Sequence, residues 1–170
     1  QIGLTIDFAK ATFERYADDI DLYWVALPMR TWNACSQIEP EWTAWDNAKR
    51  DLWVRDKEPQ MISDPAIFPF YYEGMSFEEF VPAFGQWYAQ DKLTACFVGI
   101  RADESLNRFR TIARKNKPTY QGKPWTTNCI DQVWNVYPIY DWHVHDIWTY
   151  LGREHLAYNR LYDRMFQAGV

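Results

Sequence analysis

The segment Phe97-Val-Gly-Ile-Arg-Ala-Asp-Glu-Ser-Leu-Asn-Arg108 is the most informative part of the chain. The overlapping run Leu93 to Val98 is apolar and contains β-branched and aromatic residues, which predicts a buried strand. Gly99 interrupts that run, and the pattern from Glu104 to Arg114 predicts a helix. A strand, a tight turn and a helix start therefore follow one another, with charged residues concentrated at the turn.

Arg101 and Arg108 make this turn a candidate anion site. Ligands of open α/β sheets bind beyond the carboxyl ends of the strands, and a helix N-terminus there offers unpaired N–H groups. The guanidinium fork also matches the oxygens of phosphate or sulfate. The alternative is a surface turn that only forms ion pairs, in which Glu104 holds the arginines and Ser105 caps the helix. The residue types alone leave both interpretations open.

Length and composition predict one soluble globular domain. The chain has 170 residues, of which 48% are apolar and 24% charged, enough for a hydrophobic core. The net charge of −5 argues against a broad nucleic-acid-binding surface, although a local basic cluster can still hold a nucleotide. Aromatic residues make up 18%, and most lie in apolar segments, so we expect core rings rather than exposed stacking surfaces.

The cysteines and histidines predict neither a disulfide framework nor a metal site. Cys35, Cys96 and Cys129 are odd in number and far apart in sequence, which favours a reducing cytoplasm. His143 and His145 point apart on a helix. The sequence shows no signal peptide and no apolar span of membrane length, so no membrane partner is expected. The chain begins in mid-pattern without Met, which suggests a fragment.

Alternating helices and strands predict an α/β fold. Besides the elements around Gly99, we expect helices over Leu4–Asp18, Phe77–Ala89, His143–Tyr150 and after Asn159. A further short helix is expected to open at Asn33 to Ser36. The expected strands are Ile20–Ala26, Asp51–Arg55 and Val133–Tyr137. Ser76-Phe-Glu-Glu79 is a capping box, and Asp141 is a candidate N-cap for the helix beginning at His143.

Helical spacing also predicts which side chains pack inward. These are Phe80, Phe84 and Trp87 in one helix, Leu106, Phe109 and Ile112 in the next, and Leu161, Met165 and Phe166 in the last. A basic segment in the first half contains Lys49, Arg50, Arg55 and Lys57. It is either a wall that adds positive charge to a nucleotide site or a solvated surface, and we favour the surface.

Three motifs resemble those of the phosphoadenosine phosphosulfate (PAPS) reductase family. They are Gly99-x-Arg101-x-x-Glu104-Ser105-x-x-Arg108, Pro138-Ile-Tyr-Asp141-Trp142-x-x-x-Asp146-Ile-Trp148, and Tyr158-Asn159-x-Leu161-Tyr162-Asp163. The resemblance covers the chain from Leu93 onward. Their order and spacing agree with the family pattern, which makes the combined signal more specific than any one motif.

The resemblance implies an α/β three-layer sandwich with a mainly parallel sheet, adenine nucleotide alpha-hydrolase-like. We expect residues 1–170 to form a single domain that is incomplete at both ends and lacks its N-terminal strands. The implied substrate and phosphate site consists of Arg101, Glu104, Ser105 and Arg108, with Asp141, or alternatively Asp146, as an orienting group. No catalytic residue is assigned.

The implied reaction is reduction of phosphoadenylyl sulfate to sulfite by a cysteine thiolate, with thioredoxin or glutaredoxin as partner. Two departures limit this expectation. The family's glycine-rich phosphate loop has no counterpart among the seven glycines, and its C-terminal Glu-Cys-Gly segment is missing. We therefore expect this chain to bind the anion end of the nucleotide weakly without turnover, and a full-length protein to carry the reaction.

Two alternatives remain open. One is an ATP-splitting sulfur-transfer enzyme, which would need Mg²⁺; otherwise no cofactor is expected. The other is a non-catalytic interaction module that uses the tryptophans of the first half as a partner surface. Missing strands would leave a sheet edge exposed, which favours a homodimer.

Overall fold

The computed structural model describes residues 2–169, which form a mixed α/β structure with small sheets. The chain divides into two compact units, Trp24–Asp141 and the combination of Gln1–Tyr23 with Trp142–Val170. Each unit is described separately below. The single domain over residues 1–170 stays a prediction. No helix in the described part of the chain is long and apolar enough to cross a membrane.

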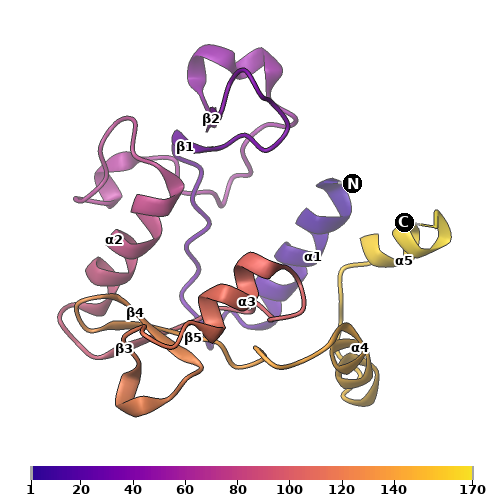
Figure 1. Ribbon diagram of the computed structural model, residues 1–170. Helices are drawn as coiled ribbons and strands as arrows, with labels where there is room; N and C mark the ends of the chain where they lie inside the picture. Colours follow the sequence, from indigo (N-terminus) through magenta and orange to yellow (C-terminus); the bar gives the residue numbers. More distant parts are fainter. Residues whose placement is uncertain (1, 170) are drawn as a thin grey trace. The chain divides into compact units, whose positions relative to one another are not determined.

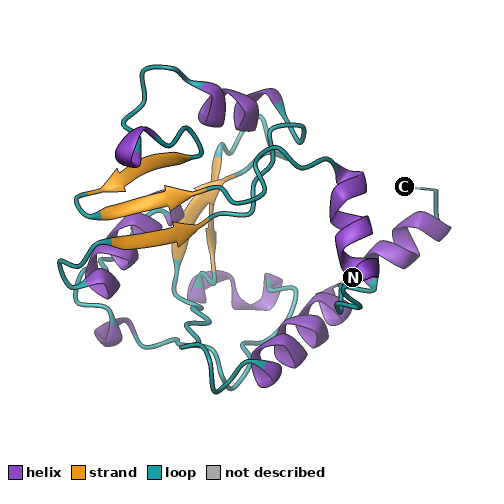
Figure 2. Cartoon of the chain, turned by 90° about the horizontal axis from the view of Figure 1, so that it is seen from below, coloured by secondary structure: helices purple, strands orange, loops and turns teal. Residues whose placement is uncertain are grey.

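The larger unit contains a three-stranded sheet of order β3-β5-β4 (Figure 2). Strands β3 (Thr94–Phe97) and β5 (Val133–Val136) are parallel, and Thr94 pairs with Val133. Strand β4 (Thr126–Ile130) is antiparallel to β5, with an irregularity between Asn128 and Ile130. The predicted strands around β3 and β5 are confirmed, whereas β4 lies where no strand was expected.

The expectation of a mainly parallel sheet needs correction. Among the described residues, the larger sheet has one parallel and one antiparallel pair, and the second sheet is antiparallel. The cause lies in the link between β4 and β5, which consists only of Asp131 and Gln132. A two-residue link permits only antiparallel neighbours. Asp131 adopts a positive φ of 41°, as such tight links require.

Helix α2 (Phe77–Ala89) packs against all three strands of this sheet and has the predicted bounds. The predicted capping box is confirmed. The Glu79 N–H donates to Ser76 Oγ at 3.2 Å, and the Ser76 N–H donates to Glu79 Oε2 at 2.8 Å. Helix and sheet approach closely at Gly85, where an added Cβ would lie 3.3 Å from Val133 Cγ1.

The core beside α2 is an aromatic cluster around Phe68. Its ring packs against those of Phe70, Phe80, Phe84 and Trp87, with centroid separations of 5.4–6.1 Å. Phe68 is almost fully buried. It follows the short 3-10 helix η2 (Pro65–Ile67), which the Asp64 side chain caps. The prediction that the three α2 rings share one inward face is confirmed.

The other part of this unit is a hairpin of β1 (Met29–Trp32) and β2 (Glu41–Ala44), followed by the 3-10 helix η1 (Asn47–Leu52). Figure 1 shows β1, β2 and η1 together at the top of the view. In place of the short helix expected at Asn33, a turn joins the two strands, and the Asn33 side chain accepts from the Cys35 N–H.

Two expected strands of the first half are wrong. Within Ile20–Ala26, Val25 forms an isolated bridge with Ile62, and the strand begins only after Pro28. Around this bridge the Ala26 N–H donates to Ile62 O and the Ile62 N–H donates to Trp24 O, both at 2.8 Å, and a single bridge does not make the ladder of paired residues that defines a strand. The expected strand at Asp51–Arg55 is replaced by the end of η1, because the Asp46 side chain caps η1 by accepting from the Ala48 N–H at 2.9 Å.

The smaller unit contains α1 (Ile2–Arg15), α4 (Val144–Arg153) and α5 (Leu161–Gln167). The Asn159 side chain donates to Thr5 Oγ1 at 3.1 Å, which joins the two ends of the chain. The Trp148 ring packs edge-on against Tyr158 and Tyr162. All three helices lie in regions where helices were expected.

Three details of the smaller unit and of α3 (Leu106–Ala113) differ from expectation. His143, not Asp141, is the N-cap of α4, and its N–H donates to Asp146 Oδ2 at 2.7 Å. Asp146 can fold back because it lies three residues after the cap. Phe166 and Met165 of α5 are exposed. In α3, Ile112 is buried while Leu106 and Phe109 are exposed.

Candidate functional site

The turns that follow β3 and β5 lie side by side at the carboxyl ends of these parallel strands. The Val98 N–H donates to Val136 O at 2.9 Å and extends the strand pairing by one residue. Beyond it, the Ala102 N–H donates to Tyr140 O at 2.8 Å. Two of the motifs found in the sequence therefore meet at the edge of the sheet where open α/β proteins bind ligands.

Arg101 is the buried residue of the first turn, with 9% of its surface exposed. Its Nη1 lies 2.8 Å from Asp103 Oδ1, and its Nε lies 3.3 Å from Glu104 Oε1. Removing a guanidinium from water costs free energy unless carboxylates such as these pair with it. Glu104 also pairs with Arg108 Nη1, so the two arginines of the motif meet at one carboxylate.

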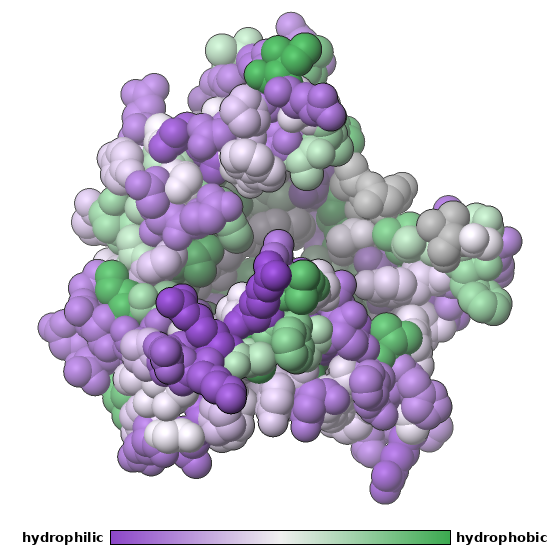
Figure 3. Space-filling view, viewed as in Figure 1, coloured by the Kyte–Doolittle hydropathy of each residue, from purple (hydrophilic) through white to green (hydrophobic). Residues whose placement is uncertain are grey.

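The start of α3 agrees with the alternative in which Ser105 caps the helix. Its Oγ accepts from the Arg108 N–H at 3.2 Å, so Ser105 is the N-cap of the helix. Arg108, Arg110, Arg114 and Lys115 are exposed, and Figure 3 shows strongly hydrophilic side chains gathered over α3. Glu104 and Ser105 thus shape the turn, while their contact with a ligand stays a prediction.

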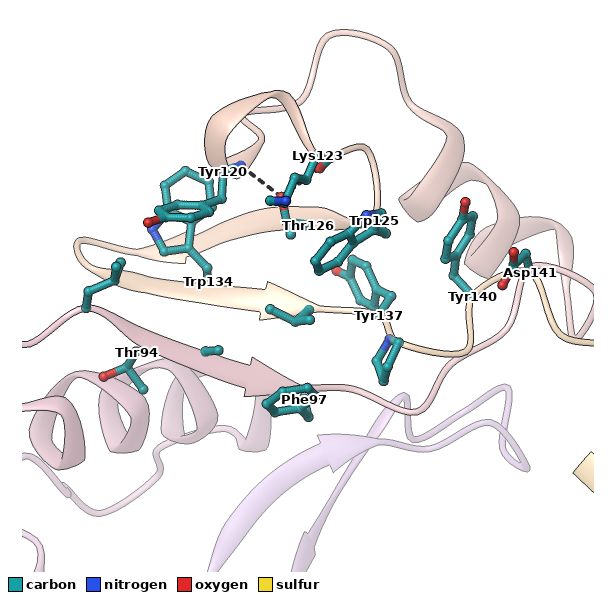
Figure 4. A pocket seen from close by; sticks show the side chains of 14 residues that line it. Thr94, Phe97, Tyr120, Lys123, Trp125, Thr126, Trp134, Tyr137, Tyr140 and Asp141 are labelled. Atoms are coloured by element: carbon teal, nitrogen blue, oxygen red, sulfur yellow. Dashed lines mark hydrogen bonds between the residues drawn. The ribbon is translucent and has the colours of Figure 1, made fainter. Parts of the chain in front are cut away.

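A pocket of about 760 Å³ lies over one face of the β3-β5-β4 sheet (Figure 4). Val133 points toward α2, and side chains alternate along a strand, so Trp134 and Val136 of β5 both lie on the opposite face. Aromatic rings dominate the lining: Phe97, Tyr120, Trp125, Trp134, Tyr137 and Tyr140. Lys123 and Asp141 are its charged residues.

Asp141 is therefore the only predicted site residue that lines this pocket, among the residues described. Arg101, Glu104, Ser105 and Arg108 belong to the neighbouring turn. The link between the two regions is Tyr140, whose carbonyl oxygen accepts from Ala102 and whose side chain extends beside Asp141 (Figure 4).

Thr126 holds the upper wall of the pocket in place. It is almost fully buried, its Oγ1 accepts from the Tyr120 N–H at 2.8 Å, and it donates to Lys123 O at 2.8 Å. These bonds join β4 to the short 3-10 helix η3 (Tyr120–Gly122). The Tyr120 ring then lies edge-on to Trp134 with centroids 5.4 Å apart.

Two lysines lie on pocket rings. Lys123 Nζ is 5.4 Å from the Trp125 ring centre, and Lys117 Nζ is 5.6 Å from that of Tyr137. Lys117 Nζ is buried without a hydrogen-bond partner in the described structure, and burial lowers the pKa of Lys117. Both contacts are attractive because an aromatic face is electron-rich.

The sequence interpretation missed the aromatic pocket. It assigned most of the rings to the core and treated residues 117–124 as a loop in which Lys117 and Lys123 add positive charge near the anion site. The missed signal is the density of rings between Tyr120 and Tyr140, interrupted by polar residues such as Thr126 and Asn135. Such mixing is typical of a ligand-binding face.

The half-buried cysteines are poorly suited to act as thiolates. Burial raises the pKa of Cys96, and burial followed by the charge of Cys96 raises the pKa of Cys129. The reactive form of cysteine is the thiolate, so a raised pKa suppresses its reactivity. All three cysteines are free thiols, and no group of three or more potential metal ligands occurs among the described residues.

Comparison with known proteins identifies the class. The family model described as "Phosphoadenosine phosphosulfate reductase domain" matches residues 4–168. The chain therefore belongs to this family, which implies an adenine nucleotide alpha-hydrolase-like fold.

Two curated relatives add detail. The chain is 46% identical over 173 aligned residues to "Uncharacterized protein YbdN" of Escherichia coli K12, covering all of this chain and 42% of that protein. It is 39% identical over 79 residues to "Uncharacterized protein MJ0066" of Methanocaldococcus jannaschii, covering 46% of this chain and 14% of that protein. The chain thus spans less than half the length of either relative. No solved structure matches it significantly.

Proposed function

We propose that this chain binds an adenine nucleotide carrying a sulfate or phosphate group, at the aromatic pocket and the adjoining turn from Gly99 to Glu104. The observation that carries this proposal is the hydrogen bond from the Ala102 N–H to Tyr140 O. It joins two motif segments of a nucleotide-binding family directly beside a pocket rich in aromatic rings.

The pocket and the turn suit different parts of such a ligand. The rings of Trp125 and Trp134 offer faces on which a purine can stack. Lys123 is an exposed cation at the pocket wall and suits a phosphate group. Arg101 has five N–H donors in a fixed fork, and we propose that it directs part of that fork to the anion while Glu104 keeps the side chain in place.

The reaction that we propose for a protein of this family with a suitable thiol is reduction of phosphoadenylyl sulfate to sulfite. The thiolate attacks the sulfate sulfur, and adenosine 3′,5′-bisphosphate leaves with the bridging oxygen. A second thiol then attacks the cysteine's own sulfur atom in this adduct. The bond from that atom to the sulfonate sulfur breaks and sulfite leaves. The resulting disulfide is reduced by thioredoxin or glutaredoxin. Burial raises the pKa of Cys96 and Cys129, so neither is proposed as that thiol.

Calorimetric titration with adenosine 3′,5′-bisphosphate tests the binding proposal. We expect saturable binding that Lys123→Gln weakens about tenfold, because a charged hydrogen bond contributes roughly 1.5 kcal/mol. The matched control is Lys115→Gln, which removes the same charge from an exposed lysine outside the pocket lining and leaves the affinity unchanged.

Parallel titrations separate the alternatives. Binding of ATP with Mg²⁺ in place of the bisphosphate would replace the reductase assignment with the ATP-splitting one. Absence of binding to either nucleotide would leave the non-catalytic interaction module as the function. Equal effects of the two lysine variants would show that the pocket is not the binding site.

A further inference from the structure

A second group of cations gathers on two tryptophans at the end of the β1–β2 hairpin. The rings of Trp45 and Trp53 are edge-on, with centroids 5.1 Å apart. The Arg50 guanidinium lies 5.7 Å from the Trp53 ring centre, and that of Arg55 lies 5.7 Å from Trp45. Lys57 Nζ is 5.4 Å from Trp53 and 5.7 Å from Trp45. We call these five residues the cation–tryptophan cluster.

Local hydrogen bonds hold the two rings in this arrangement. Helix η1 turns the chain between Trp45 and Trp53, and the Asp46 side chain caps it by accepting from the Ala48 N–H at 2.9 Å. The carbonyl oxygen of Asp46 accepts from Trp53 Nε1, also at 2.9 Å. One residue therefore positions both the turn and the indole, so the cluster is pre-organised.

The cluster contains three cations, and the carboxylates nearest to it in sequence are those of Asp46, Asp51, Asp56 and Glu58. Arg50 pairs with Asp56 at 3.6 Å, and both side chains are largely exposed, so the pair neutralises little. Within residues 2–169, neither Arg55 nor Lys57 forms an ion pair, and the buried Nη1 of Arg55 lacks a hydrogen-bond partner. Burial, followed by the charge of Arg50, lowers the pKa of Lys57.

A cation–π contact attracts a single cation, but three cations on two rings also repel one another. An anion between them would remove that repulsion. The arginine fork presents two parallel N–H groups to a tetrahedral oxyanion, and an ammonium group adds a point charge. The unpaired Nη1 of Arg55 would gain the partner that it lacks.

We propose that the cation–tryptophan cluster binds a phosphate-type oxyanion, with Arg55 and Lys57 as principal ligands. This site is built from residues outside the aromatic pocket and the Gly99–Glu104 turn, so it does not rest on the nucleotide proposal. It also gives a function to the basic segment of the first half, for which the sequence offered a solvated surface or the wall of a nucleotide site.

Nuclear magnetic resonance of the indole N–H groups tests this inference directly. The probe is inorganic phosphate added to the whole chain, and the signals of Trp45 and Trp53 are assigned from Trp45→Phe and Trp53→Phe. We expect saturable shifts of both signals. Arg55→Gln and Lys57→Gln should each weaken the apparent affinity at least about fivefold. The matched control is Lys49→Gln, an exposed lysine of η1, with a change below about twofold.

A second readout is the pKa of Lys57, followed through its side-chain carbon signals. A bound anion favours the charged ammonium, so saturating phosphate should raise this pKa. The variant Lys123→Gln should leave the phosphate-induced shifts at Trp45 and Trp53 unchanged, which separates this site from the pocket. Both Arg55→Gln and Lys57→Gln are used because one of them can fail to fold, which loss of indole signal dispersion would reveal, and the other variant then still tests the inference.

Absence of saturable shifts in the unmodified chain would overturn the inference, and so would equal weakening by Lys49→Gln and Arg55→Gln. Either result would mean that the cations only cover the rings. The source of the oxyanion follows from two further arms. Adenosine 5′-monophosphate producing the same shifts indicates a small phosphate ester, whereas tighter binding of a short oligothymidylate with steep salt dependence indicates a phosphodiester backbone.

Discussion

Glu104 is the residue on which the motif turn depends. Its two oxygens reach different arginines, the buried Arg101 and the half-exposed Arg108. The pair with Arg101 matters more, because a guanidinium removed from water needs its carboxylates, while an exposed pair contributes little. Asp103 is the second carboxylate on Arg101, at 2.8 Å from Nη1.

The first prediction concerns this carboxylate. Glu104→Gln should lower the free energy of unfolding by about 2 kcal/mol, because a charge-assisted hydrogen bond to a buried arginine is lost. Arg108→Gln should cost less than about 1 kcal/mol, since it breaks only the exposed half of the arrangement. Urea unfolding followed by tryptophan fluorescence measures both. Equal costs for the two variants would contradict the central role of Glu104.

Helix α2 is the element that fixes the sheet, and its first turn carries a pH-dependent bond. The Glu79 carboxylate accepts from the Ser76 side chain at 2.7 Å and from its backbone N–H at 2.8 Å. These bonds, with a smaller contribution from Tyr72, lower the pKa of Glu79 from 4.5 to about 2. The charged form is the one that caps the helix.

The second prediction follows from this lowered pKa. A carboxylate whose pKa falls on folding stabilises the protein above its unfolded pKa and loses that contribution as pH falls toward the folded one. The stability difference between the unmodified chain and Glu79→Gln should thus be complete above about pH 5 and vanish toward pH 2. Urea unfolding at several pH values measures it. Glu78→Gln removes an equal charge from the same turn, and its difference should vary less with pH.

The third prediction concerns the contact between α2 and β5. Alanine normally stabilises a helix relative to glycine by roughly 0.5–1 kcal/mol, but a Cβ at Gly85 would lie 3.3 Å from the buried Val133 side chain. Gly85→Ala should therefore give no gain in the unmodified chain and a gain of about 0.5–1 kcal/mol in a Val133→Ala background. Thermal unfolding of the four variants forms the double-mutant cycle. Additive effects would mean that the contact is not tight.

On the scale of the whole molecule, β3 is an outer strand of its sheet. In the described structure, β5 pairs with one side of β3, and the other side has no strand neighbour. Phe97 of this strand is 73% exposed, and Leu93 just before it is also exposed. A flat outer strand with apolar side chains is a template for pairing with another chain.

The fourth prediction is self-association through this edge, as the expected homodimer requires. Sedimentation velocity at increasing protein concentration should show a dimer, and Leu93→Lys should shift the equilibrium toward monomer because a charge at a strand edge opposes pairing. Leu52→Lys is the matched control, since Leu52 is exposed on η1 and outside the sheet. A chain that stays monomeric at all concentrations would contradict this prediction.

Local signals in the sequence predicted those elements whose stabilising contacts are close in the chain. The bounds of α2 follow from the Ser76–Glu79 capping box, and Ser105 caps α3 three residues from its partner. Strands β3 and β5 were expected because continuous apolar runs bounded by Gly99 and Pro138 suit buried strands. The proximity of Asp141 to a pocket was anticipated only through the family motif.

Pairing between distant segments was decided by the tertiary structure alone. Whether Ile20–Ala26 becomes a strand depends on a partner elsewhere in the chain, and the parallel pairing of β3 with β5 joins segments almost forty residues apart. The aromatic pocket likewise joins side chains from β3 with side chains from β4 and β5, which are far from β3 in the sequence. Capping and helical periodicity act over three or four residues, so the sequence by itself determined the helices. The three ordered motifs of the sequence indicated the family. The pairing of β3 with β5 and the packing of the pocket rings depend on contacts between distant segments, so only the fold determined the aromatic pocket.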